Sequence, residues 1–143
     1  MVKRMKCLTD GVETYYELYG ESGEKVLLLH GWGCDHKLME PVAEQLQKQF
    51  RVLAIDFPGH GESGRPPEPW GVEEYAEHTL KVIQELAFVP TAVIAHSFGC
   101  RVATVLAAEH PDIFTKMVFT GAAGIRPQRT KEAEERNRKY QEL

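Results

Sequence analysis

The stretch AHSFGC places Ser97 where the chain changes from a strand to a helix. Residues 91–95 (TAVIA) have the apolar composition of a buried strand, and residues 101–110 (RVATVLAAEH) have that of a helix. A turn this sharp needs small neighbours, and Ala95 and Gly99 meet that need. The turn would lift the Ser97 hydroxyl above the sheet at a helix N-terminus, where the helix dipole favours developing negative charge. Ser97 is therefore a candidate nucleophile.

Alternating strands and helices must position this serine. Residues 2–9 and 12–19 flank Asp10-Gly11, a dipeptide that favours a tight turn, so the chain is predicted to open with an antiparallel hairpin. Apolar runs predict buried strands at KVLLLH, RVLAID, TAVIA and KMVFTG. Helices are predicted over about residues 39–50, with Pro41 near the first turn, and over 72–87 and 101–110. This order implies an α/β fold, a doubly wound and mostly parallel sheet with helices on both faces.

Composition limits the classes of partner. The chain has 143 residues, enough for one domain with one core, and a net charge of -4 with mixed signs. Neither nucleic acid nor a membrane is expected to bind it. The three cysteines are far apart and lack zinc-site spacing, so free thiols are expected. The first residues contain no apolar run of signal-peptide length, which indicates a cytoplasmic protein.

Three glycine-containing loops follow predicted strands, at the sheet edge where open parallel sheets bind ligands. They are HGWG at residues 30–33, DFPGHGES at 56–63 and AHSFG at 95–99. Together, in this order, they resemble three motifs of the α/β-hydrolase family. In this family the nucleophile lies in a sharp strand-to-helix turn, the nucleophile elbow, with the pattern GxSxG. In this sequence Ala95 replaces the first glycine of that pattern. The resemblance covers the chain from the first hairpin to residue 130.

The resemblance implies a role for each matching position. Ser97 would be the nucleophile, and the backbone N–H groups of Trp32 and Phe98 would be the two donors of an oxyanion hole. The implied reaction is hydrolysis of an ester or similar acyl bond of a small molecule through acyl-Ser97, with no metal or organic cofactor. Asp56 and His60 in the DFPGHGES loop would be structural.

The base and the acid of a catalytic triad are missing from the expected places. In this family the order along the chain is serine, acid, histidine. His110 alone among the histidines follows Ser97, and a dozen helical residues would hold it about 18 Å away. The chain therefore resembles the N-terminal part of a family member. Residues 1–126 would form part of the core domain, and 127–143 a charged helix at the start of a cap.

The other histidines need an interpretation as well. His30 and His96 are expected to pack as structure, and His36 and His78 to lie on the surface. The loop of His60 alone is expected to come near Ser97, so His60 stays a secondary candidate for the base. Cys100 is expected to be a small buried thiol rather than a second nucleophile.

Two functions remain open at this stage. The first is a serine hydrolase of the family type, and the second is an inactive fragment or interaction half that needs a second chain to supply the acid and base. The strand at residues 116–121 would lie at an open sheet edge, and such edges pair with other chains. A homodimer through this strand is therefore predicted, and a monomer in light scattering at micromolar concentration would contradict it.

Overall fold

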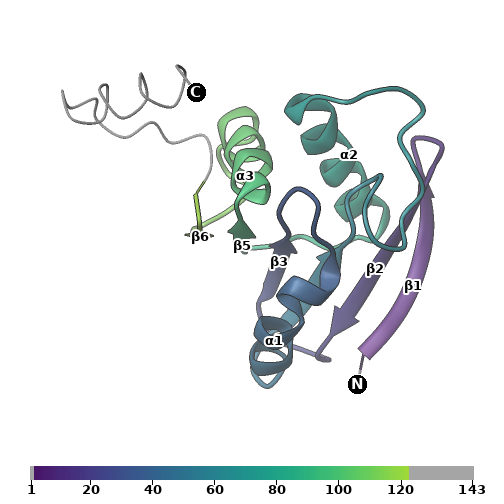
Figure 1. Cartoon of the computed structure of the whole chain (residues 1–143). Helices are drawn as coiled ribbons and strands as arrows, with labels where there is room; N and C mark the ends of the chain where they lie inside the picture. Colours follow the sequence, from purple (N-terminus) through teal and green to yellow (C-terminus); the bar gives the residue numbers. More distant parts are fainter. Residues whose placement is uncertain (1, 123–143) are drawn as a thin grey trace, which may run out of the picture.

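The computed structural model of the chain describes residues 2–122 (Figure 1). One sheet has the strand order β1-β2-β4-β3-β5-β6, with antiparallel pairs β1·β2 and β2·β4 and parallel pairs among β4, β3, β5 and β6. The elements are β1 Val2–Thr9, β2 Val12–Tyr19, β3 Lys25–Leu29, α1 His36–Leu46, β4 Arg51–Ile55, α2 Val72–Glu85, β5 Ala92–His96, α3 Phe98–Glu109 and β6 Lys116–Thr120. The predicted fold class and opening hairpin are confirmed.

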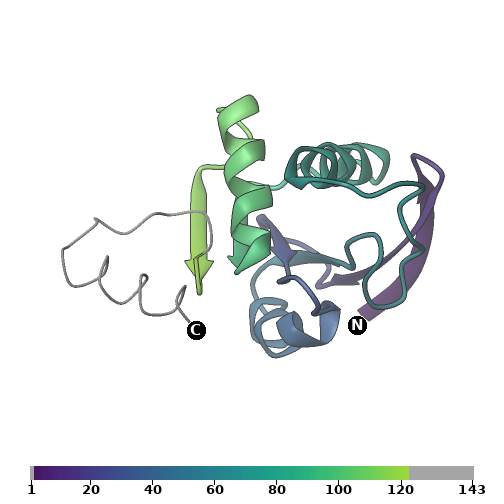
Figure 2. The same ribbon diagram turned by 45° about the horizontal axis from the view of Figure 1, so that its top comes forward.

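Helices cover both faces of the sheet. Figure 2 shows α1 on one side of the strands and α2 with α3 on the other. Successive side chains of a strand point to opposite faces, so the apolar run of β4 serves two cores. Val52 and Ala54 pack with Met39 of α1, whereas Leu53 and Ile55 pack in the larger core that α2 and α3 close. This double cover explains why the central strands are apolar throughout.

The first helix differs from the prediction. It runs over His36–Leu46 rather than residues 39–50, so Pro41 lies inside the helix and not in its first turn. The reason is the N-cap: the Asp35 carboxylate accepts a hydrogen bond from the Lys37 amide at 2.9 Å and starts the helix three residues earlier. Apolar spacing alone does not locate such a cap.

The last described strand, β6, lies at the edge of the sheet as predicted, with Val118 52% exposed. The homodimer through this edge stays a prediction. The predicted charged helix over residues 127–143 lies outside the described residues. Within residues 2–122, no helix has the length and apolar character that crossing a membrane requires.

His78 lies in the core and not on the surface as predicted. Its Nε2 atom is 2.9 Å from the Thr14 hydroxyl oxygen, and its ring packs on Trp70 with centroids 5.3 Å apart. The helical face that carries Tyr75, Thr79 and Val82 also carries His78, which is fully buried. Burial lowers the pKa of His78 to about 4, because a charged ring would lose its hydration.

This lowered pKa predicts an acid-sensitive fold. Below pH 6.5 the unfolded chain binds a proton at His78 that the folded chain does not bind, so the free energy of unfolding falls as the pH falls towards 4. The full loss from this residue is about 3 kcal/mol. Urea unfolding at several pH values should show a smaller pH dependence in His78→Gln than in the parent chain. Equal slopes between pH 4 and 6.5 would contradict the prediction.

Candidate functional site

Ser97 sits in a strained turn between β5 and α3. Its backbone dihedrals are φ 50° and ψ -113°, a positive φ that side chains other than glycine rarely adopt. The Ser97 amide donates to the Thr120 carbonyl at 3.0 Å, and the Cys100 amide donates to the Ser97 carbonyl at 2.9 Å. These bonds fix the turn on both sides of the serine. Strain held in place by its surroundings is typical of functional sites.

Gly99 permits this turn. A Cβ atom at Gly99 would lie 2.4 Å from the carbonyl oxygen of Leu29 and 2.7 Å from that of His30. The first turn of α3 therefore lies directly against the end of β3. Ala95, at the other flank, is fully buried and takes the place of the family glycine.

The loop after β3 runs beside the serine. A Cβ atom at Gly31 would lie 3.2 Å from the Ser97 Cβ atom. Within residues 2–122 no acceptor takes the Trp32 amide, and Phe98 is the first residue of α3, where an N–H group has no acceptor within the helix. Both predicted oxyanion donors thus belong to segments that flank Ser97.

His30 and His96 pack as structure, as predicted. The His30 Nδ1–H group donates to the Gly31 carbonyl at 2.7 Å, and Nε2 accepts from the Phe57 amide at 3.0 Å. Burial lowers the pKa of His30 to about 4, which keeps the ring neutral and leaves Nε2 free to accept. His96 Nδ1 lies 3.0 Å from the Thr120 hydroxyl.

Among residues 2–122, no side chain hydrogen-bonds to the Ser97 hydroxyl. Ser97 precedes the twelve-residue helix α3 and His110 follows it, so the whole length of α3 lies between the two residues. His60 is buried with Nδ1 3.1 Å from the Pro58 carbonyl, and its ring lies against Trp32 with centroids 4.9 Å apart. Cys100 is buried, and its Sγ atom lies 3.4 Å from the Ala95 carbonyl oxygen.

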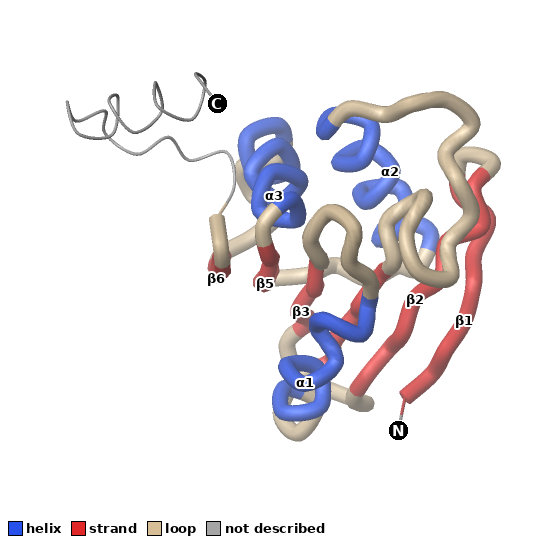
Figure 3. The backbone as a smooth tube through the Cα atoms, in the orientation of Figure 1, coloured by secondary structure: helices blue, strands red, loops and turns tan. Residues whose placement is uncertain are grey.

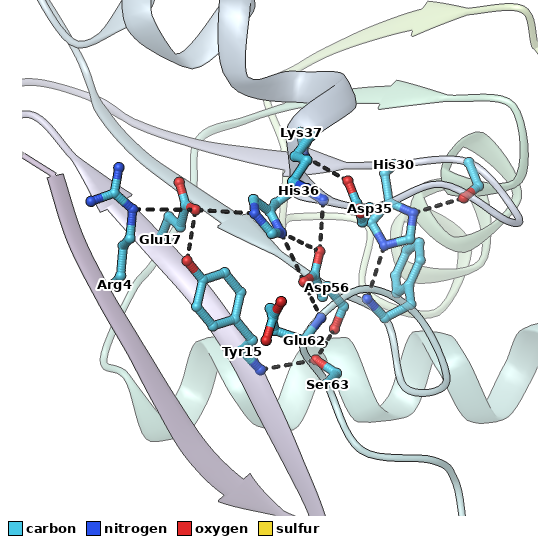
Figure 4. Close-up of polar contacts among 12 residues, drawn as sticks. Arg4, Tyr15, Glu17, His30, Asp35, His36, Lys37, Asp56, Glu62 and Ser63 are labelled. Atoms are coloured by element: carbon cyan, nitrogen blue, oxygen red, sulfur yellow. Dashed lines mark hydrogen bonds and ion pairs between the residues drawn. The ribbon is translucent and has the colours of Figure 1, made fainter.

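Asp56 is a buried carboxylate at the end of β4, in the role of scaffold that was predicted for it. It accepts from the His36 amide at 2.6 Å and from the Glu62 amide at 2.9 Å, and its two oxygens lie 3.0 and 2.8 Å from His36 Nδ1 (Figure 4). His36 is therefore buried against Asp56 rather than exposed as predicted. Its other ring nitrogen, Nε2, lies 3.4 Å from Glu17 Oε1.

A groove of about 770 Å³ opens beside the Trp32 loop. The loops after β3 and β4 lie next to each other at one end of the sheet (Figure 3). Residues of both loops line the groove. The Trp32 ring stands edge-on to the rings of Tyr75 in the groove and Phe98 at the elbow, with centroids 5.9 and 5.3 Å apart. The Trp32 ring thus contacts both Tyr75 of the groove and Phe98, the residue after Ser97. The described lining carries one cationic side chain, Arg65, and two carboxylates, Asp35 and Glu68.

Comparison with known proteins identifies the same fold. The family described as "alpha/beta hydrolase fold" matches residues 25–141. The chain is 26% identical to (E)-2-((N-methylformamido)methylene)succinate hydrolase of Acinetobacter baylyi, over 93% of this chain and 50% of that protein. It is 31% identical to 2-(acetamidomethylene)succinate hydrolase of Mesorhizobium japonicum, over 68% of this chain and 35% of that protein.

A solved structure agrees with these relatives. The crystal structure of a bacterial membrane phospholipase A superposes with a TM-score of 0.85 at 26% identity, covering 96% of this chain and 46% of that one. The chain spans half or less of the length of each of these proteins. The family match over most of the chain agrees with the strand order and with the three loops at one edge of the sheet. The chain therefore belongs to the alpha/beta hydrolase fold family.

Proposed function

We propose that the chain carries the nucleophile and the oxyanion hole of a serine hydrolase that cleaves esters or similar acyl bonds. The observation that carries the proposal is the positive φ of Ser97, held between the Thr120 carbonyl and the Gly99 contact with β3. A strained serine that begins a helix beside a loop with a free amide is the arrangement that acyl transfer needs.

The reaction would proceed through two acyl transfers. The Ser97 oxygen attacks the substrate carbonyl carbon while its proton passes to a base, and the N–H groups of Trp32 and Phe98 donate to the resulting oxyanion. The tetrahedral intermediate expels the leaving group, which takes the proton from the base. Water then attacks acyl-Ser97 in the same way and releases the acid. One oxyanion donor typically contributes about 3 kcal/mol to such a transition state.

The base and acid of this reaction lie outside the described residues in our proposal. No described side chain hydrogen-bonds to the Ser97 hydroxyl, and the chain has no histidine beyond His110. Residues 1–126 would then supply the nucleophile part of a core domain, and 127–143 the start of a cap. A further segment or a second polypeptide would supply the triad partners. By itself the chain would keep only the smaller rate enhancement of an oxyanion hole and substrate binding, about 10³–10⁴ over water.

The groove beside Trp32 supports a small-molecule substrate. Its volume suits a compact ligand, and it combines the rings of Trp32 and Tyr75 with the cation of Arg65. The two succinate hydrolases named above act on amides that carry carboxylates, by their names. We propose that this chain accepts a related class, a short acyl ester or amide whose apolar part lies against Trp32 and whose carboxylate pairs with Arg65.

Labelling with a fluorophosphonate tests the nucleophile. Intact mass should show a single adduct that forms slowly on the parent chain and no adduct on Ser97→Ala. The reason is that Ser97 is the one serine whose attack the oxyanion hole would stabilise. Ser22→Ala is the matched control: Ser22 is exposed and distant from Ser97 in the sequence, so this variant should label like the parent chain. An adduct that persists in Ser97→Ala, or a parent chain that never labels, would overturn the proposal.

A further inference from the structure

We infer that His36 is a positioning residue, which holds the loop of residues 31–35 in the place where the Trp32 amide can serve Ser97. It does so by fixing the end of this loop to Asp56, while Glu17 fixes the orientation of the His36 ring. The inference rests on the proposed function, since it assigns the Trp32 amide to the oxyanion hole.

Both ends of this loop are bound to adjacent residues at the end of β4. At the beginning, His30 binds the Gly31 carbonyl through Nδ1 and accepts the Phe57 amide through Nε2. At the other end, the His36 amide and ring bind the carboxylate of Asp56 (Figure 4). Because the segment between these anchors has only five residues, its amides can move little while both anchors hold.

Glu17 determines which way the His36 ring faces. Its carboxylate is buried, with an exposed fraction of 3%, and it accepts from the Tyr15 hydroxyl at 2.8 Å and the Tyr19 hydroxyl at 2.5 Å. Arg4 of β1 adds a cation 3.8 Å away. These bonds hold Oε1 opposite Nε2 of His36, so that Nδ1 faces Asp56. The ring therefore lies between two buried carboxylates, and neither nitrogen is available for other partners.

The position of His36 in the chain separates this role from helix stability. α1 is capped by the Asp35 side chain, and the backbone amide of residue 36 can bind Asp56 whatever side chain is present. Loss of the ring therefore removes the side-chain anchor of the loop but leaves both the cap and the backbone bond. A variant at this position should fold and still misplace Trp32.

Two substitutions separate the contact of Nδ1 with Asp56 from the contact of Nε2 with Glu17. The amide nitrogen of an asparagine side chain comes near the place of Nδ1, and that of glutamine near the place of Nε2. His36→Asn should keep the bond to Asp56 and His36→Gln should keep only the contact with Glu17. We expect His36→Asn to label at Ser97 at nearly the parent rate, and His36→Gln and His36→Ala about tenfold more slowly, because a displaced donor loses part of its effect on the oxyanion.

A second measurement follows the loop without any reaction. In a Trp70→Phe background Trp32 is the sole tryptophan, so its time-resolved fluorescence anisotropy reports motion of the loop. His36→Gln should show a larger fast decay than His36→Asn, with both variants folded by circular dichroism. Equal anisotropy and equal labelling of the two variants would overturn the inference. Altered anisotropy with unchanged labelling would support the positioning role and instead contradict the oxyanion role of Trp32 in the proposed function.

Discussion

Gly99→Ala should lower the free energy of unfolding by about 3 kcal/mol and abolish labelling of Ser97. The added Cβ atom would meet two backbone carbonyl oxygens of the β3 end at 2.4 and 2.7 Å, and backbone atoms of a central strand cannot move aside as a flexible side chain can. The helix must instead retreat from the sheet, which moves Ser97 away from the Trp32 loop. Urea unfolding and intact mass after fluorophosphonate treatment measure the two effects.

Gly64→Ala is the matched control for this variant. A Cβ atom there would meet its nearest neighbours, in Glu13, at an ordinary 3.6 Å. It should therefore change the free energy of unfolding by less than about 1 kcal/mol and leave labelling intact. The account of the elbow fails if Gly99→Ala is as stable and as reactive as this control.

Asp56→Ala should be about as damaging to the fold, with an expected loss of about 3–5 kcal/mol, because each buried donor left without an acceptor costs about 1–3 kcal/mol. The variant would leave three groups without their acceptor inside the protein: the amides of His36 and Glu62 and the ring of His36. The loop after β4, which forms a wall of the groove, would lose its attachment to α1. Urea unfolding measures the loss of stability.

Asp35→Ala provides the comparison, because it also removes one aspartate at the same end of α1. Asp35 makes a single capping bond to the Lys37 amide, and losing an N-cap costs about 1 kcal/mol. The two variants differ mainly in the burial and number of bonds of the carboxylate. A loss in Asp56→Ala no larger than that in Asp35→Ala would contradict the role assigned to the buried network.

The strands and the elbow were predictable because local patterns determine them. Continuous apolar runs predicted the central strands, and Asp10-Gly11 predicted a hairpin turn whose two residues do have positive φ values of 52° and 74°. The sharp turn at Ser97 follows from a strand, a serine, a small residue and a helix in immediate succession. The start of α1 was missed because a capping bond from Asp35 competes with the apolar spacing that suggested a later start.

The burial of His36 and His78 was not predictable from the same patterns. His36 is buried because Glu17 on β2 and Asp56 directly after β4, 19 and 20 residues away in the sequence, converge on its ring. A polar residue among charged neighbours otherwise suggests exposure. His78 occupies an apolar face of α2 and bonds to Thr14 of the hairpin, a contact across 64 residues. Long-range polar pairs of this kind depend on the whole fold rather than on local spacing.

The pH dependence of Ser97 labelling tests the central claim most directly, namely that the described part of the chain holds a prepared serine without its base. The pseudo-first-order rate of fluorophosphonate labelling is measured by intact mass between pH 6 and 9, with Ser97→Ala as the blank. We expect a rate that rises about tenfold per pH unit without a plateau, because hydroxide must remove the serine proton when no side chain does so. A sigmoidal profile with a midpoint near the ordinary imidazole pKa of about 6.5 would contradict the claim, and its loss in His60→Ala would identify the base.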